Sequence, residues 1–229
     1  MHHRLIGSTN AHARALATAG ATHGTVVTAT EQSAGRGRAH RRWEAPAGSS
    51  VLMSVVIRDL GDEAALLPLT AAVALCDVLE PWLDDVAIKW PNDVWVAGCK
   101  VAGILVEGRP QEDWAVLGMG VNVLTPAEEL PEHATSVTAA GATAATVEET
   151  LTALLSALEG RLAQPPGEML AAWRERDALL GCTVTWGEGS GTAAGVDGDG
   201  SLLVDVPGGV RLALDAGEVH LGSASVPFG

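Results

Sequence analysis

The spacing of apolar side chains predicts four helices. An alanine-rich segment over 10–19, with Ser8 or Thr9 before it and Gly20 after it, is typical of a short capped helix. Apolar residues recur at helical spacing over 62–79 and again after Thr146, which opens a capping box. A fourth helix is expected over 168–179, directly after two prolines.

Runs of β-branched and apolar residues predict the strands. In the first part of the chain they cover 25–30, 51–57, 86–90, 94–96, 101–107 and 114–122. The last of these contains Gly118 and Gly120, and glycines inside a strand often mark the close approach of a ligand or a backbone. Residues 31–49 show no periodicity and predict a long loop, a feature that is usually functional.

The pattern changes near Gly181. Beyond it, short strands separated by glycine-rich turns are expected over 182–186, 192–196, 201–206 and 210–214. Strands at this spacing predict a small barrel. We therefore expect an α+β protein with two domains, a mixed sheet with helices over 1–180 and a small β-barrel over 181–229.

Composition limits the class of protein. With 229 residues and 47 % hydrophobic side chains the chain can bury a substantial core, and no apolar run reaches the ~18–20 residues of a membrane span. The start is too short for a secretory signal peptide. Three widely spaced cysteines without a C-x-x-C pair argue against a disulfide framework or a zinc ribbon. We expect a cytoplasmic protein.

The few positive charges are gathered into two short stretches. The net charge of −14 argues against general nucleic-acid binding, which depends on many Lys and Arg. The chain has only two lysines, Lys89 and Lys100, and four of its twelve arginines lie within 36–42. An acidic protein that concentrates its cations in this way is expected to build one anion site.

Residues 35–43, here called the Gly-Arg loop, carry the strongest local signal. Alternating glycine and arginine leaves backbone N–H groups accessible, and guanidinium forks match both carboxylates and phosphates. Trp43 adds a flat surface on which a purine could stack. Taken alone, the loop is equally compatible with a solvated basic segment, and RNA binding is a third option that the acidic remainder disfavours.

Two further segments carry candidate chemistry. Lys89, Asp93 and Lys100 lie beside apolar strands, which suits neutralisation of phosphates with Mg²⁺ near the carboxylate. An ordinary surface ion pair between Lys89 and Asp93 is the alternative. The stretch from Gly118 to Asn122 is, by itself, compatible with a plain buried strand.

Taken together and in order, these segments resemble the biotin protein ligase family. The matching blocks are Ser8-Thr9-Asn10, Glu31-Gln32-Ser33-Ala34 with the Gly-Arg loop, KWPND at 89–93, KVAGILVE at 100–107 and GMGVN at 118–122. One departure is His40, where the family commonly has glycine. The resemblance implies a biotin-lipoate ligase catalytic domain, similar to class II synthetases, followed by an SH3-like C-terminal domain.

The reaction that the resemblance implies has two steps. ATP, with Mg²⁺, activates the carboxylate of biotin as biotinyl-5′-AMP and releases pyrophosphate. A specific lysine of the biotin carboxyl carrier protein of acetyl-CoA carboxylase then takes the biotinyl group. Since the intermediate is an adenylate, no nucleophilic side chain is expected.

The same resemblance assigns residues to three overlapping groups. The biotin-binding group is Ser8, Thr9, Asn10, Gln32, Arg36, Gly37, Arg38 and Lys100. The ATP-binding group is Arg38, Trp43, Lys89, Asp93 and Asn122, with Asp93 also the Mg²⁺ ligand. The catalytic group is Lys100, Arg36 and Arg38, with Lys100 stabilising the charge that develops at the acyl phosphate.

Two rival functions remain at the level of sequence. A lipoyl or octanoyl ligase or transferase shares the fold but would not need the Gly-Arg loop with Trp43, and a thiol-dependent transferase would need a reactive cysteine, whereas Cys76 lies in a helical pattern. A non-catalytic biotin-binding module would not need Lys100. We expect a monomer or homodimer without membrane association. Because Ser8-Thr9-Asn10 lies almost at the start, we expect no DNA-binding domain before it.

Overall fold

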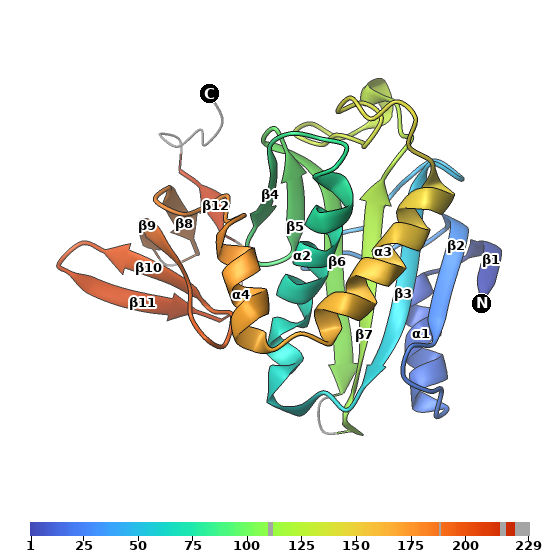
Figure 1. Ribbon diagram of the computed structural model, residues 1–229, viewed down its shortest axis with the longest axis horizontal. Coiled ribbons are helices and arrows are strands. Elements are labelled where there is room, and N and C mark those ends of the chain that lie inside the picture. Colours follow the sequence, from blue (N-terminus) through green and yellow to red (C-terminus); the bar gives the residue numbers. More distant parts are fainter. Residues whose placement is uncertain (110–111, 188, 216–218, 223–229) are drawn as a thin grey trace.

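A mixed sheet of seven strands organises the larger part of the molecule (Figure 1). The computed structural model describes residues 1–109, 112–187, 189–215 and 219–222. In spatial order the strands are β1 (His2–Ile6), β2 (Val26–Gln32), β3 (Ser50–Arg58), β7 (Trp114–Asn122), β6 (Cys99–Arg109), β5 (Asp93–Val96) and β4 (Val86–Lys89). β1 and β2 run parallel, and every other neighbouring pair is antiparallel.

Helices cover both faces of this sheet (Figure 1). Side chains alternate between the faces of a strand, so Val55 and Leu117 join the main core with α2 (Leu67–Leu79) and α3 (Val147–Leu162), whereas Val56 and Val116 pack in a second cluster with α1 (Thr9–Thr18). Among the residues that the structure describes, further helical segments are α4 (Pro166–Arg174) and the 3₁₀ turns η1 (Gly61–Leu66) and η3 (Ala127–Glu129). The sheet is therefore buried on both sides.

The helix starts follow the capping residues in the sequence. Ser8 caps α1, where its side chain accepts a hydrogen bond from the backbone N–H of Ala11 at 3.4 Å. Thr146 caps α3 by accepting from the N–H of Glu149 at 3.2 Å and donating its hydroxyl proton to the Glu149 carboxylate at 2.8 Å. The helix predicted over 62–79 is divided into η1 and α2.

The last described part of the chain forms a second, antiparallel sheet. Its strands, in spatial order, are β11 (Val210–Leu214), β10 (Leu202–Val206), β9 (Gly189–Val196), β8 (Thr183–Trp186) and β12 (His220–Leu221). Together with the mixed sheet and its helices, this sheet confirms the predicted α+β class and is consistent with a small C-terminal β domain. The indole N–H of Trp90 donates to the carbonyl of Gly200 at 2.9 Å, which ties the small sheet to the larger one. The boundary at 180–181 stays a prediction.

Three elements differ from the sequence-based prediction. Strands β1 and β12 are short and were not predicted. The helix expected over 168–179 ends at Arg174. Its last residues instead lie along the outer edge of β4, where the N–H of Ile88 donates to the carbonyl of Arg176 at 2.7 Å and the carbonyl of Ile88 accepts from the N–H of Ala178 at 3.0 Å. Pairing with a sheet edge overrides the helical pattern there.

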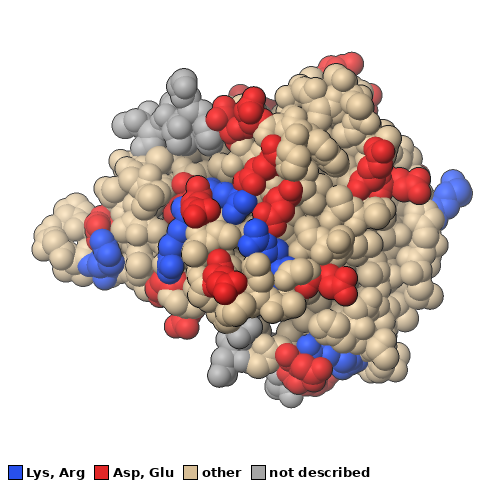
Figure 2. All heavy atoms as spheres, in the orientation of Figure 1, with Lys and Arg blue, Asp and Glu red and all other residues tan. Residues whose placement is uncertain are grey.

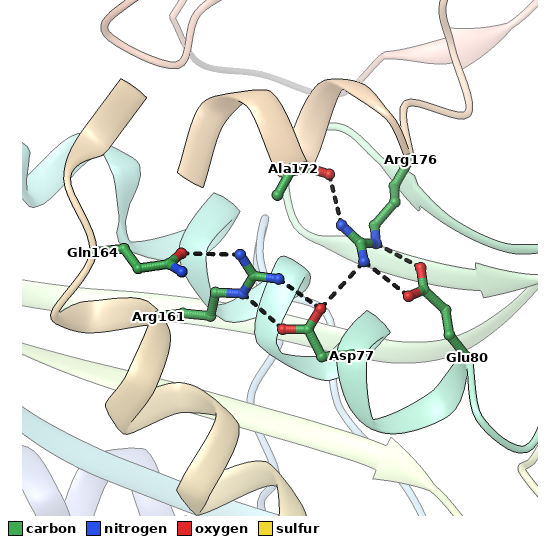
Figure 3. Close-up of polar contacts among 6 residues, drawn as sticks. All are labelled: Asp77, Glu80, Arg161, Gln164, Ala172 and Arg176. Carbon is green, nitrogen blue, oxygen red and sulfur yellow. Dashed lines mark hydrogen bonds and ion pairs between the residues drawn. The ribbon is translucent and has the colours of Figure 1, made fainter. Parts of the chain in front are cut away.

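On the face of the sheet that α2 covers, charged side chains connect α2, α3 and the end of α4 (Figure 3). Arg161 donates to both carboxylate oxygens of Asp77 at 2.6 and 2.7 Å, and Arg176 reaches Asp77 and Glu80. Acidic side chains spread over this face, with Lys and Arg side chains among them (Figure 2). The hydrogen bond to Asp77 raises the pKa of Arg161, and the one to Glu80 raises the pKa of Arg176, so both guanidinium groups stay charged. The network fixes how α3 and α4 sit on α2.

Asp177 makes the stability of this junction depend on pH. Burial raises the pKa of its carboxyl from 3.8 to about 6, and Oδ1 accepts from the N–H of Leu179. The pKa of Asp177 is higher in the folded state than in the unfolded state. Its contribution to the free energy of unfolding is therefore fully present below pH 3.8 and is lost as the pH rises through 6. Asp177→Asn is therefore expected to be more stable than the natural chain by about 1–3 kcal/mol at pH 8 and nearly equal at pH 4. Urea unfolding at both pH values checks this.

The exposed Asp84, changed to asparagine in the same way, is the control. A stability difference for Asp177→Asn that is the same at pH 4 and pH 8 would contradict this interpretation.

Within the described ranges, no helix combines the length and the apolar character needed to traverse a bilayer.

Candidate functional site

A cavity of about 200 Å³ lies at the N-terminal end of α1, against strands β6 and β7. It gathers sequence-distant residues that the sequence analysis singled out: Ser8, Thr9, Asn10, Gln32, Arg36, Gly37, Arg38, Trp43, Lys89, Asp93 and Lys100. They come from α1, β2, the Gly-Arg loop, β4, β5 and β6. The sheet thus brings all the cationic segments of the chain to one place.

One end of the cavity, the head end, is a fixed set of uncharged hydrogen-bonding groups. The backbone N–H and hydroxyl of Thr9 donate to Gln32 Oε1 at 2.7 and 3.1 Å. The hydroxyl of Ser54 lies 2.6 Å from Asn10 Oδ1 and 2.9 Å from Thr9 Oγ1. Because Thr9, Asn10 and Ser54 are buried, the network is rigid and suits a neutral polar group of a ligand.

Glycines in β6 and β7 form the floor of the cavity. A Cβ on Gly118 would lie 1.9 Å from Asn10 Oδ1, and one on Gly120 would lie 2.5 Å from the Trp43 indole, which also covers Gly103. The side chains of Asn10 and Trp43 thus lie directly against these glycines, which also line the cavity. Gly118 and Gly120 are two residues apart, so Asn10 and Trp43 stand about 7 Å apart along β7.

The Gly-Arg loop is held by its own backbone contacts. The N–H of Gly37 donates to the carbonyl of Arg41 at 2.8 Å, and Trp43 N–H donates to the carbonyl of Gly35 at 3.2 Å. A Cβ on Gly35 would lie 2.2 Å from the carbonyl oxygen of Trp43, so only glycine fits there. His40 has φ 61°, a left-handed conformation that favours glycine. Its backbone thus keeps the shape that a glycine would adopt.

The other end, the anion end, presents cations that neighbouring groups hold in position. Lys100 Nζ lies 2.7 Å from Asp93 Oδ1 and 5.8 Å from the centre of the Trp43 ring. Arg38 donates to the side-chain oxygen of Asn92 at 3.0 Å. In turn, β6 fixes Asn92, whose amide donates to the carbonyl of Ile104 at 2.8 Å. These groups are preorganised for a carboxylate or a phosphate.

Two predicted residues behave differently from the others. The ammonium of Lys89 lies over the Trp95 ring at 5.4 Å, while Lys89 still lines the cavity. Asn122 does not line it: its side chain is buried, and its amide donates to the carbonyl of Thr135 at 3.1 Å. This hydrogen bond joins Asn122 to the chain beside β7, and the contact of Asn122 with the nucleotide stays a prediction.

Several lining residues received no individual role from their place in the sequence. Asn92 lies in the KWPND block but received no role, and Arg41 and Arg42 belong to the Gly-Arg loop. The apolar wall consists of Leu52, Met53, Ile104, Leu105 and Met119. Leu52 and Met53 belong to a strand whose apolar pattern indicated only core, whereas Ile104, Leu105 and Met119 lie in the KVAGILVE and GMGVN blocks but received no individual role. Val219 and His220 come from the small sheet, and only the tertiary structure could place them here.

The described residues contain no cluster of three or more His, Cys, Asp or Glu side chains that could hold a metal ion. Asp93 is a single carboxylate already paired with Lys100. Mg²⁺ in nucleotide sites often uses one or two carboxylates plus the phosphates of the substrate, so Asp93 fits a metal that arrives with ATP. All three cysteines are free thiols, and burial raises the pKa of the Cys76 thiol, which leaves it unreactive.

The fold and the site together define a family. The model of the Biotin/lipoate A/B protein ligase family matches residues 4–123. The chain therefore belongs to this family. The likeness that the sequence blocks indicated is thereby confirmed.

Two relatives and one solved structure show which members of the family this chain is similar to. The chain is 36 % identical to a biotin--[acetyl-CoA-carboxylase] ligase of Mycobacterium tuberculosis, covering 94 % of this chain and 86 % of the relative. It is 37 % identical to a protein of the same name from Paracoccus denitrificans, covering 94 % and 97 %. The structure is similar to that of the Aquifex aeolicus biotin protein ligase in complex with biotin and ATP, with a TM-score of 0.81, 26 % identity and 97 % coverage of both chains.

Proposed function

We propose that this chain is an ATP-dependent biotin ligase. It joins biotin to AMP and then transfers the biotinyl group to a lysine of the biotin carboxyl carrier protein of acetyl-CoA carboxylase. The observation that carries the proposal is the cavity itself, in which an uncharged polar end, an apolar wall and a cationic end follow one another. A ligand with a polar head, an aliphatic chain and a terminal carboxylate matches that sequence of surfaces.

In the first step, a carboxylate oxygen of biotin attacks the α-phosphorus of ATP, and pyrophosphate leaves. Both reactants are anions, so the step requires positive charge that is already in place. Arg36 and Arg38 supply it from the Gly-Arg loop and Lys100 from β6, and Lys89 of β4 adds a fourth cation for the phosphates. Mg²⁺, when bound with ATP, neutralises phosphate charge, with Asp93 as the carboxylate available to it.

In the second step, the ε-amine of the carrier lysine attacks the acyl carbon of biotinyl-5′-AMP, and AMP leaves. Lys100 stabilises the oxyanion that forms at that carbon. The head end holds the biotin ring through Ser8, Thr9, Asn10 and Gln32, and Trp43 offers its indole to the adenine. The two domains are 1–180 and 181–229, and the second contributes Val219 and His220 to the cavity.

DNA binding, cellular location, oligomeric state and the rival substrate complete the proposal. A net charge of −14 disfavours specific DNA binding, and we propose that the protein works in the reducing cytoplasm as a monomer or homodimer. The family also contains lipoate ligases, so lipoate is the rival substrate. The relatives compared above carry names that specify biotin.

Pyrophosphate release tests the proposal. With ATP and Mg²⁺, biotin is expected to start pyrophosphate release, whereas lipoate at the same concentration is not. Addition of a biotin carboxyl carrier protein is expected to yield a carrier whose mass increases by one biotinyl group. Release with lipoate but not with biotin would favour the rival substrate. Biotin binding without any release would favour a non-catalytic binding module.

A further inference from the structure

Glu107 lies where α1, β6 and the Gly-Arg loop meet. Its side chain is 17 % exposed, and it accepts hydrogen bonds from three different side chains. Oε1 lies 2.9 Å from Nη2 of Arg36 and 3.3 Å from Nη1 of Arg14, and Oε2 lies 3.0 Å from Nδ2 of Asn10. Glu107 does not line the cavity, although Asn10 and Arg36 do. No step of the proposed reaction uses this carboxylate directly.

Glu107 is one of two acceptors that determine which way the amide of Asn10 points. An asparagine side chain offers either its oxygen or its NH₂ to a neighbour, and its partners decide which. A carboxylate only accepts, so the NH₂ of Asn10 must face Glu107, where it also donates to the carbonyl of Leu105 at 3.3 Å. The amide oxygen then faces the hydroxyl of Ser54 at 2.6 Å. The polarity of the head end is therefore set by Glu107 together with the Leu105 carbonyl, and Glu107 makes the shorter and charge-assisted hydrogen bond of the two.

Glu107 also anchors the Gly-Arg loop at Arg36. The hydrogen bonds inside this loop join its backbone to itself, as between Gly37 and Arg41. The ion pair from Arg36 to Glu107 instead crosses from the loop to β6. Arg38, which donates to the side-chain oxygen of Asn92 between β4 and β5, and Trp43, which lies near Lys100 of β6, also join the loop to the sheet. The first arginine of the loop is thus held over β6 before any ligand arrives.

We propose that Glu107 is a positioning residue that serves both ends of the cavity. A single carboxylate orients the Asn10 amide at the head end and holds Arg36 at the anion end. The effect on biotin recognition rests on the proposed function, whereas the anchoring of the loop does not. Removing the carboxylate therefore weakens biotin recognition and loosens the loop together.

Two measurements on Glu107→Ala test the two halves of the proposal. The KM for biotin in pyrophosphate release is expected to rise about tenfold or more, as for the loss of a hydrogen bond to a charged group, with a smaller fall in kcat. Trypsin is expected to cut the Gly-Arg loop after Arg38, Arg41 and Arg42 several times faster than in the natural chain. Glu107→Gln keeps one acceptor oxygen and is expected to give intermediate values in both measurements.

A double-mutant cycle with Arg36→Ala separates positioning from general destabilisation. Once Arg36 is absent, Glu107→Ala is expected to add little further loop cleavage, because the anchor is already broken. Glu112→Ala, which removes an exposed carboxylate paired with Arg109 on the same sheet, is the matched control and is expected to leave KM and loop cleavage unchanged. Additive effects in the cycle would overturn the proposal, as would a natural KM and a natural cleavage rate in Glu107→Ala.

The two proposals fail in different ways. If the natural chain released no pyrophosphate with biotin, the proposed function would fall, and the trypsin measurements would still decide whether Glu107 anchors Arg36. If pyrophosphate release were normal and loop cleavage were the same with and without Glu107, the positioning role would fall alone. If Glu107→Ala did not fold, Glu107→Gln with faster loop cleavage would support the proposal, and unchanged cleavage would overturn it.

Discussion

Lys100→Ala is expected to lower biotin-dependent pyrophosphate release by about 10²- to 10³-fold, the usual cost of removing one preorganised electrostatic group. Lys100 is one of two lysines in the chain, and its Nζ lies 2.7 Å from Asp93 at the anion end of the cavity. Without it, the Asp93 carboxylate faces the incoming anions without its cation. The side chain is 35 % exposed, so its loss opens no buried cavity and the protein is expected to stay folded.

Three comparisons make this result specific. Arg109→Ala removes a cation whose exposed ion pair with Glu112 lies outside the cavity, and it is expected to leave the rate unchanged. Thermal unfolding shows whether Lys100→Ala keeps its stability. The double variant of Lys100→Ala with Asp93→Asn is expected to remain slow, because neutralising Asp93 does not restore the missing cation. A rate for Lys100→Ala within a few-fold of the natural one would show that Lys100 has no part in the chemistry.

Gly118→Ala is expected to weaken biotin binding about 100-fold, in line with the effect of an ångström-scale misplacement in a site. The added Cβ would lie 1.9 Å from Asn10 Oδ1, so the buried Asn10 side chain must leave its position. The same overlap is expected to cost about 1–3 kcal/mol of stability. Isothermal titration with biotin and urea unfolding measure the two effects.

A second substitution separates the two losses. Adding Asn10→Ala to Gly118→Ala removes the overlap, so stability is expected to recover while biotin binding stays weak. Gly160→Ala, which meets no atom within 4 Å in α3, is the control and is expected to be slightly stabilising. Natural biotin affinity in Gly118→Ala would contradict the position that Asn10 takes in the site.

The local elements of the fold could be predicted because local chemistry determines them. Ser8 and Thr146 are side chains that satisfy helix N–H groups, and α1 and α3 start at the residues that follow them. The strand predicted over 114–122 matches β7. By contrast, β1 is a short segment stabilised by its parallel pairing with β2, far along the chain. Residues after Arg174 pair with β4 for the same non-local reason, so their helical pattern misled.

The site was predictable to the extent that its residues are unusual in the chain. Scarce cations and a glycine-rich loop indicated an anion site, and the structure gathers them. Asn122, which its sequence block assigns to the nucleotide, donates its amide to Thr135, a contact that the sequence did not indicate. The role of Glu107 depends on contacts with Asn10 and Arg36, which are remote in sequence. Such a contact exists only once the sheet has formed.

A crystal structure with biotin and ATP bound tests the central claim most directly. We expect the polar ring of the ligand beside Thr9 and Asn10, its acyl phosphate within hydrogen-bond distance of Lys100 and Arg38, and the Gly-Arg loop closed over it. A ligand seated elsewhere on the protein, or one in this cavity with its carboxyl end turned away from Lys100 and the Gly-Arg loop, would contradict the account.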